Sequence, residues 1–152
     1  MSSIISSFQM KSNRVVEFKL NQKDASKECE TINVSFKADY LISDISEEDN
    51  FFIAKVDLLT SLKGKTDYDK EIFEIILDMQ GVFTGDAETL NEEQFNDMLS
   101  LNGVSTLMQL SRAFVTSSTA LSGFDRPINF PMINVFELNK LKKKRIKNDD
   151  IV

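Results

Sequence analysis

Residues 32–42 read INVSFKADYLI, and apolar side chains recur at every second position of this stretch. A period of two is typical of a β-strand that buries one face and leaves the other in water. Residues 52–62 repeat the pattern, and residues 70–84 are apolar on one face and partly apolar on the other. A shorter first strand is indicated by Val16, Phe18 and Leu20. Because these strands follow one another at hairpin spacing, the sequence predicts an antiparallel meander.

Two turns separate the long strands in this prediction. The acidic segment 43–50 follows the strand at residues 32–42, and Lys63-Gly64-Lys65 with Asp67 follows the strand at residues 52–62. Glycine, asparagine and aspartate favour such positions because they tolerate turn conformations that other residues avoid.

The hydrophobic period changes after residue 88. Thr89-Leu90-Asn91-Glu92 matches a capping box, Gly103 interrupts the helical pattern that follows, and Ser105 can cap a second, longer helix that ends at Ser122-Gly123. Residues 124–134 contain both prolines and predict an extended loop, after which a last helix begins at Val135. Strands followed by helices predict one α+β domain over residues 1–152, with the helices packed on one face of the sheet.

Composition and charge narrow the class of protein. Of 152 residues, 41% are hydrophobic and 28% are charged, which is typical of a soluble globular protein. The net charge of −6 argues against nucleic acid as the main partner. No apolar run approaches the ~20 residues of a membrane span, and the first residues lack a signal-peptide pattern. We therefore expect a cytoplasmic protein without membrane insertion, and the lone Cys29 agrees with a reducing compartment.

The C-terminal segment 139–152 has the opposite charge. The segment contains six Lys and Arg residues and two acidic residues, Asp149 and Asp150. Its net charge is therefore 6 − 2 = +4, and the net charge of the rest of the chain is −6 − 4 = −10. A solvated helix end is the favoured interpretation, because cations are stabilised near the negative end of a helix dipole. A contact for an acidic partner or RNA is the alternative.

Residues able to support catalysis are scarce. The chain has no histidine and one cysteine, which excludes Ser-His-Asp and Cys-His catalysis and histidine-bound metals. The five glycines form no phosphate-binding loop, and the acidic clusters at 44–49 and 86–93 lack calcium-loop spacing. Cys29 lies between Glu28 and Glu30, whose charges raise a thiol pKa and make it a poor nucleophile. We expect no enzyme, no metal and no cofactor.

Phenylalanine is abundant, with 12 of the 14 aromatic residues. Core packing explains those on the strands. It explains less well the apolar residues of the proline-containing loop, which either fill a core or line a binding surface. Both interpretations stay open for Phe124, Ile128, Phe130 and Met132.

Residues 74–83 read EIILDMQGVF, and residues 107–134 combine Arg112 with Gly123, Ile128-Asn129 and Ile133-Asn134. These two stretches resemble the SecB family of protein-export chaperones, and the first is similar to the family's fourth strand. In residues 107–134, Arg112 falls at the family's helix arginine, and Gly123, Ile128-Asn129 and Ile133-Asn134 fit its loop pattern without a gap. The order of strands, long helix, apolar loop and last helix is also the family's, so the resemblance spans nearly the whole chain.

The resemblance implies a fold and a function. SecB-like proteins have a four-stranded antiparallel sheet with a long outer helix, and their dimers pair into homotetramers with the long helices between the sheets. They are ATP-independent holdases that keep precursor proteins unfolded for export. The resemblance implies an apolar client-binding site at Ile32, Val34, Phe36, Phe124, Ile128, Phe130 and Met132. Its oligomer interface would include Leu107, Leu110, Ser111, Phe114 and Ser118 of the long helix, where small residues permit close approach.

The sequence also departs from the family pattern. Residues 21–30 contain none of the aromatics that form a second peptide subsite in the family, and Glu74 and Ile76 stand where the family has an apolar residue and a Glu. Client binding is therefore better supported than docking to the SecA motor. Two alternatives remain: a dedicated chaperone of one client, such as the antitoxin of a toxin–antitoxin system, and an adaptor of the same fold that binds one folded partner.

Overall fold

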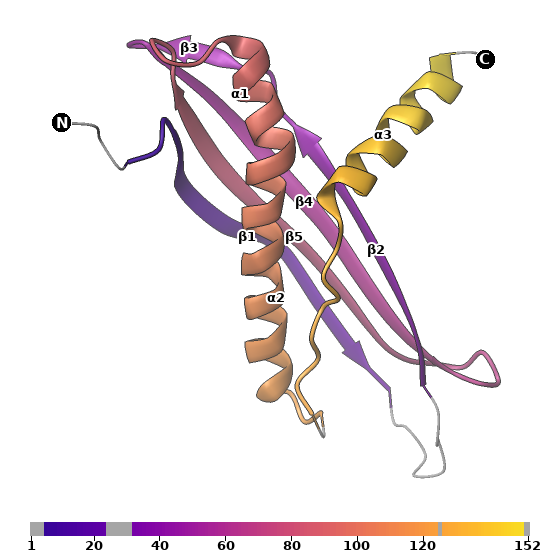
Figure 1. Ribbon diagram of the computed structural model, residues 1–152. Coiled ribbons are helices and arrows are strands. Elements are labelled where there is room, and N and C mark those ends of the chain that lie inside the picture. The colour runs from indigo at the N-terminus through magenta and orange to yellow at the C-terminus, as the bar shows by residue number, and fades with distance from the viewer. Residues whose placement is uncertain (1–4, 24–31, 125, 151–152) are drawn as a thin grey trace.

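The computed structural model describes residues 5–124 without 24–31, and residues 126–150. Five strands form one antiparallel sheet in the order β1-β5-β4-β2, with the short β3 paired to β4 (Figure 1). The strands are β1 (Phe8–Gln22), β2 (Ile32–Ile42), β3 (Ser46–Glu48), β4 (Phe51–Thr66) and β5 (Glu71–Asp86). The helical elements are α1 (Glu92–Met98), a π-helical turn (Leu99–Gly103), α2 (Val104–Ala120) and α3 (Val135–Asp150).

The predicted α+β class is confirmed, and the predicted meander is wrong at its first strand. β1 pairs with β5 rather than with β2, so β1 and β2 lie at opposite edges of the sheet. β5 is buried along most of its length and has a strand on each side, which satisfies its backbone groups inside the sheet. β1 is also longer than its three periodic residues indicated.

Both predicted turns contain strand residues. β4 continues through Lys63-Gly64-Lys65 to Thr66, so that segment is strand and not turn. Gly64 makes room for a neighbouring ring, because a Cβ there would lie 2.2 Å from Phe73 Cε1. The acidic segment 43–50 contains β3 and turns at Asp49 and Asn50, whose φ angles of 50° and 66° are left-handed.

α1, the π-helical turn and α2 form one continuous rod across the sheet, and not the broken pair predicted (Figure 1). Asn91 is the N-cap: its Oδ1 accepts from the Gln94 amide at 2.7 Å, and Gln94 Oε1 accepts from the Asn91 amide at 3.0 Å. The predicted capping box at Thr89–Glu92 therefore lies two residues before the observed one, which starts at Asn91. Gly103 keeps a helical φ of −63°, so Ser105 does not begin a new helix.

The core lies between the rod and one face of the sheet. Phe83 stacks on Phe8 with ring centroids 5.3 Å apart, and Phe95 stacks on Phe52 at 5.6 Å. The rod ends at Ala120, close to its predicted end, and the chain then runs as an irregular connector to α3. The basic tail is helical to Asp150 and leads away from the sheet (Figure 1). Among the described residues, no helix has the length and apolar character needed to cross a membrane.

Candidate functional site

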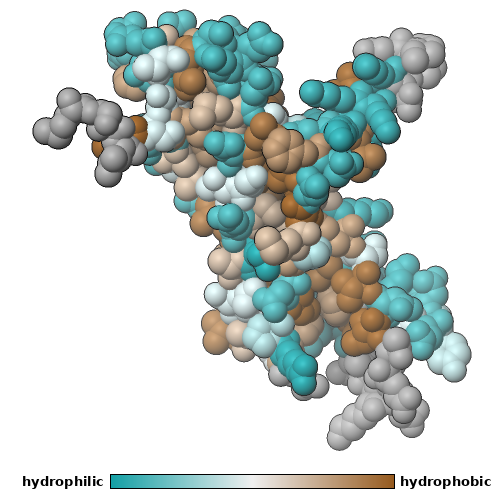
Figure 2. All heavy atoms as spheres, viewed as in Figure 1, coloured by the Kyte–Doolittle hydropathy of each residue, from teal (hydrophilic) through white to brown (hydrophobic). Residues whose placement is uncertain are grey.

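An open groove of about 790 Å³ lies between the sheet and α3. β2, β4 and β5 supply one side, and the other side comes from the end of the connector and from α3. Figure 2 shows apolar surface between the rod and α3, bordered by hydrophilic side chains. The apolar lining residues include Phe36, Ala38, Leu77, Ile133, Leu138 and Leu141. A surface of this kind suits apolar side chains of varied shape.

α3 contributes to the groove through one stripe of its surface. Leu138, Leu141 and Arg145 are spaced by three and four residues, which places them on the same side of a helix. Arg145 and Lys37 add positive charge to the lining, and Asp39 and Glu137 add negative charge. Both carboxylates are paired with lysines, at 3.1 Å for Asp39–Lys142 and 3.3 Å for Glu137–Lys140.

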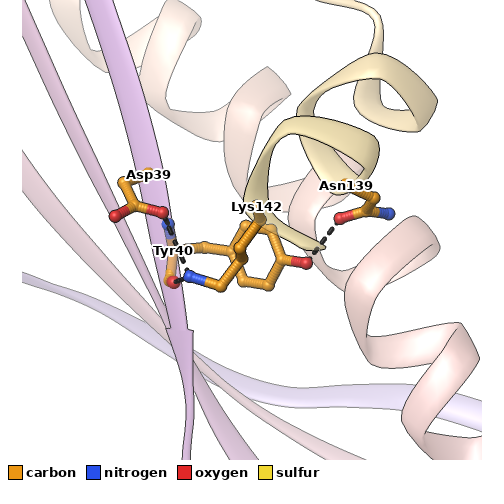
Figure 3. A network of polar contacts seen from close by, with 4 residues as sticks. All are labelled: Asp39, Tyr40, Asn139 and Lys142. Carbon is orange, nitrogen blue, oxygen red and sulfur yellow. Dashed lines mark hydrogen bonds and ion pairs between the residues drawn. The ribbon is translucent and has the colours of Figure 1, made fainter. Parts of the chain in front are cut away.

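Four polar residues hold α3 against β2, and we call them the Tyr40 clamp: Asp39, Tyr40, Asn139 and Lys142 (Figure 3). Lys142 Nζ donates to the Tyr40 carbonyl and to Asp39 Oδ1, and lies 4.4 Å from the centroid of the Tyr40 ring. The Tyr40 hydroxyl donates to Asn139 Oδ1, and Asn139 Nδ2 donates to the Ser100 carbonyl at 3.1 Å. The clamp therefore joins an edge strand, α3 and the π-helical turn.

The clamp sets the protonation of its own groups. Partial burial alone would raise the pKa of Asp39, but hydrogen bonds from Lys142 and the Tyr40 amide, and the charges of Lys142 and Arg145, hold that pKa below its ordinary value. Burial, together with the charge of Asp39, raises the pKa of the Tyr40 phenol. At neutral pH the carboxylate is ionised and the phenol keeps its proton, as their hydrogen bonds require.

The predicted client-binding residues of β2 lie on its helix-facing side. Ile32 is 45% exposed and Val34 is 58% exposed, and they pair across the sheet with Thr66 and Gly64. Phe36 is half-buried and lines the groove. The three residues therefore form one apolar row that continues from the groove toward the start of the strand.

The predicted residues of the connector divide into three kinds. Met132 is 84% exposed. Phe124 and Ile128 are half-buried, with the Phe124 ring edge-on to Phe73 at 5.6 Å. Phe130 is only 1% exposed, so the expectation that its side chain contacts a client is wrong: it belongs to the core.

Hydrogen bonds to the rod explain the burial of Phe130. Arg112 Nε donates to the Phe130 carbonyl at 2.9 Å, and the Thr119 hydroxyl accepts from the Ile128 amide at 2.7 Å. The connector is thereby fixed on α2, and the Phe130 ring packs on Phe36 with centroids 5.2 Å apart. Arg112, which the resemblance singled out, positions the connector.

The five predicted interface residues of the rod do not share one exposed face. Leu107 and Ser111 are buried against the sheet within a single chain, so neither offers surface to a second chain. Leu110, Phe114 and Ser118 are half-buried, and the Phe114 ring meets Phe18 edge-on at 4.9 Å. The exposed side of α2 instead carries Gln109, Ala113, Ser117 and Ala120.

The role of α3 as a wall of the groove was not predicted from the sequence. Leu138, Leu141 and Arg145 are spaced by three and four residues, and this spacing is the signal in the sequence that indicates such a wall. Within the part of the chain that the structure describes, no group of three or more His, Cys, Asp or Glu residues could hold a metal ion.

The sheet order, the long helical rod across one face and the connector to a last helix define the fold of SecB-like chaperones. A solved structure with this fold is the SecB-like chaperone Rv1957 of Mycobacterium tuberculosis, in complex with a ChAD peptide from the Rv1956 HigA1 antitoxin. The likeness covers 84% of this chain and 91% of that chain, with a TM-score of 0.64 and 13% sequence identity. The SecB-like fold that the sequence predicted is thereby confirmed.

A second similar structure is a protein of unknown function from Streptococcus agalactiae. It has 11% identity and a TM-score of 0.43, over 82% of this chain and 97% of that chain. No family model matches the sequence. No curated protein matches it either.

Proposed function

We propose that this protein is an ATP-independent holdase that binds unfolded polypeptide segments in the groove between the sheet and α3. The observation that carries the proposal is the apolar row of Ile32, Val34 and Phe36, which is exposed at one end and enters the groove at the other. Such a surface requires no reacting group, so we propose a binding protein and not an enzyme.

The physical basis of binding is the burial of client side chains. Each Å² of apolar surface removed from water contributes roughly 25 cal/mol, and this term does not depend on sequence. An unfolded client loses conformational entropy when it binds, which lowers affinity relative to the area buried. Moderate affinity for many segments follows, and exposed Met132 suits it because a methionine side chain adapts to varied partners.

The proposed clients are precursor proteins awaiting export. A dedicated client, such as an antitoxin, is the second candidate, and the antitoxin peptide bound to the Mycobacterium tuberculosis chaperone of similar fold supports it. Docking to SecA is the weaker part of the export proposal, because Glu74 is ion-paired with Lys63 at 3.1 Å and Ile76 lines the groove.

We further propose that the protein acts in the cytoplasm as a homotetramer, a dimer of dimers that uses the long helices. The exposed side of α2 has small or polar residues at Ala113, Ser117 and Ala120, which would let a second helix approach closely. Light scattering at several protein concentrations tests this, and a strict monomer would contradict it.

The test of the holdase proposal is aggregation of a chemically denatured client, measured by turbidity with and without the protein. We expect suppression near stoichiometric ratio and a marked loss of it in Val34→Asp. Val16→Asp is the matched control, because Val16 is 46% exposed on the opposite edge strand. Equal activity of the two variants would remove β2 from the site. No suppression by the wild-type protein, together with tight binding of one folded partner, would favour the adaptor alternative.

A further inference from the structure

The side of α3 that does not line the groove is basic. Four exposed lysines are spaced by three and four residues and therefore share one side of the helix: Lys140, Lys143, Lys144 and Lys147. Lys140 is ion-paired with Glu137 at 3.3 Å. Within the described residues, the other three form no ion pair with a carboxylate, and we call Lys143, Lys144 and Lys147 the lysine stripe.

A second charged surface forms where two segments far apart in the sequence meet. The Asn50 carbonyl accepts from the Ala87 amide at 2.9 Å, and Phe51 pairs with Asp86 across β4 and β5. These contacts place the β3 segment beside the chain that leads into the rod. Six exposed carboxylates of the two segments form a surface that we call the acidic end: Glu47, Glu48, Asp49, Glu88, Glu92 and Glu93.

The acidic end has no neutralising charge of its own. Residues 43–54 and 71–111 contain no Lys or Arg, and none of the six carboxylates forms an ion pair within the part of the chain that the structure describes. The dipole of α1 favours Glu92 and Glu93, which lie in its first turn. That dipole does not explain the carboxylates of β3 and the turn after it. Repulsion among charges of one sign is relieved by contact with a surface of the opposite sign.

The two charged surfaces lie toward the same end of the molecule. In Figure 1, α3 rises toward the end that carries β3 and the start of α1, at the top of the view. The Tyr40 clamp fixes the first half of α3 on β2, and no ion pair joins the lysine stripe to the acidic end among the described residues. Opposite charges at one end suit a twofold contact, because each copy then meets the opposite surface of the other at the same time.

These charges favour a second copy of this chain over other anionic partners. An RNA or an anionic lipid surface on the lysine stripe would also approach the acidic end, which repels it. A lipid surface needs in addition an apolar helix face, whereas Leu138 and Leu141 of α3 line the groove. A second copy offers carboxylates to the lysine stripe and lysines to the acidic end, so both contacts are attractive.

From these observations we propose that the lysine stripe of one copy binds the acidic end of a second copy, and that two such contacts, related by a twofold axis, close the pair. Neither surface lines the groove or belongs to α2. The inference therefore rests neither on the holdase function nor on the α2 contact proposed above, and its failure would leave both standing.

The first experiment measures how association depends on salt. Sedimentation velocity of the full chain at several concentrations gives its average mass in about 20 mM and about 500 mM NaCl. We expect association to be about tenfold or more weaker at high salt, because exposed ion pairs are screened there. Association through α2 should persist, because the exposed side of α2 that would pair is uncharged, so the mass at high salt is the reference. Equal masses at both salt concentrations would overturn the proposal.

The second experiment exchanges the charges of the two surfaces. The stripe variant carries Lys143→Glu, Lys144→Glu and Lys147→Glu. The end variant carries Glu47→Lys, Glu48→Lys and Glu88→Lys. Each variant alone should lose salt-dependent association by about tenfold or more, because its two surfaces then have the same sign. An equimolar mixture should regain it, since the reversed stripe of one variant meets the reversed end of the other. A mixture that does not associate would overturn the proposal.

Two controls separate this contact from other effects of charge. Substitution by Gln at the same six positions should weaken association without recovery on mixing, because no charge is reversed. Lys11→Glu with Lys55→Glu and Lys70→Glu makes the net charge change of the stripe variant at exposed positions outside both surfaces, and it should weaken association by about threefold at most. A loss in this control as large as in the stripe variant would assign the effect to net charge and overturn the proposal.

Two anionic probes test the other occupants of the lysine stripe. They are a fluorescein-labelled single-stranded RNA of about 20 nucleotides and vesicles of phosphatidylcholine with phosphatidylglycerol, each added at low salt. We expect both to bind the wild-type protein and the stripe variant equally weakly. Preferential binding of either probe to the wild-type protein, with an average mass that does not change with salt, would assign the lysine stripe to that ligand and show that the proposal is wrong.

Discussion

β1 and β2 lie at opposite edges of the same sheet, and β1 is interrupted where β2 is regular. The pairing of β1 with β5 shifts register twice, between Met10 and Ser12 and between Val15 and Glu17. Such bulges increase local twist and make an edge a poor template for another strand. β2 has no register shift and presents an apolar row, and the clamp binds the Tyr40 carbonyl near one of its ends. The two edges of one sheet therefore differ in regularity, and β1 is the less suitable edge for pairing with another strand.

The largest expected effect is a loss of stability when Phe130 of the connector, which packs on Phe36 of β2, is truncated. Phe130→Ala should lower the free energy of unfolding by about 3–5 kcal/mol, because a buried ring is lost and a cavity is left beside Phe36. Denaturant unfolding measures this. Met132→Ala, two residues away and exposed, should change stability by less than about 0.5 kcal/mol. A mild effect of Phe130→Ala on stability with a strong effect on client binding would return Phe130 to the binding site.

Removal of the clamp should sharpen the contrast between the two edges, because it frees the Tyr40 carbonyl at the β2 edge. Lys142→Ala deletes an ion pair, a hydrogen bond to the Tyr40 carbonyl and a cation–π contact, at a cost of about 1–2 kcal/mol. Hydrogen exchange should then speed up at Tyr40 and along α3. Lys144→Ala, an exposed lysine of the same helix that forms none of these contacts, serves as the control. Unchanged exchange in α3 would show that the groove alone holds the helix.

The carboxylate of the clamp should stabilise the fold above an acidic threshold. The pKa of Asp39 in the folded protein is lowered from its ordinary value of 3.8. Its stabilising contribution is therefore present above pH 3.8 and is lost as pH falls through the lower pKa of the folded protein. Asp39→Asn should therefore cost stability at neutral pH, within about 1 kcal/mol for such an exposed pair, and cost little in strong acid. Thermal unfolding from pH 2 to pH 7 measures the difference, which should widen as pH rises.

A carboxylate near the β1 edge should behave in the opposite sense, with a smaller effect. Burial, and the charges of Asp57 and Glu17, raise the pKa of Asp78, which faces Glu17 across the β1–β5 pair. Ionisation of Asp78 disfavours folding. The contribution of this group to stability is therefore complete below pH 3.8, its ordinary pKa, and falls as pH rises through the raised pKa of the folded protein. Asp78→Asn should raise the melting temperature slightly at pH 7 and leave it unchanged near pH 3. A loss of stability at pH 7 would contradict this.

Local pattern was enough to find the strands and the last helix. Alternation at residues 32–42 reports burial of one face directly, and so does the helical spacing after Val135. The pairing of β1 with β5 could not be found in this way, because register between distant strands depends on which edges remain free. Gly64 was misassigned for a related reason: its lack of a side chain serves the ring of Phe73 rather than a turn.

The candidate site was predicted in part. Ile32, Val34 and Phe36 follow from strand periodicity, but the burial of Phe130 depends on how Arg112 fixes the connector. The clamp joins Asp39 to Lys142, which are 103 residues apart, and no local pattern reports such a contact. Long-range polar contacts of this kind need the assembled fold before they can be seen.

The placement of β1 beside β5 also has a consequence during protein synthesis. The ribosome completes β1 at Gln22, but its partner is not complete until Asp86, 64 residues later. At about 5–20 residues per second, the amphipathic first strand waits for several seconds with nothing to pair with. During that interval the nascent chain is itself an unfolded polypeptide of the kind that a holdase protects.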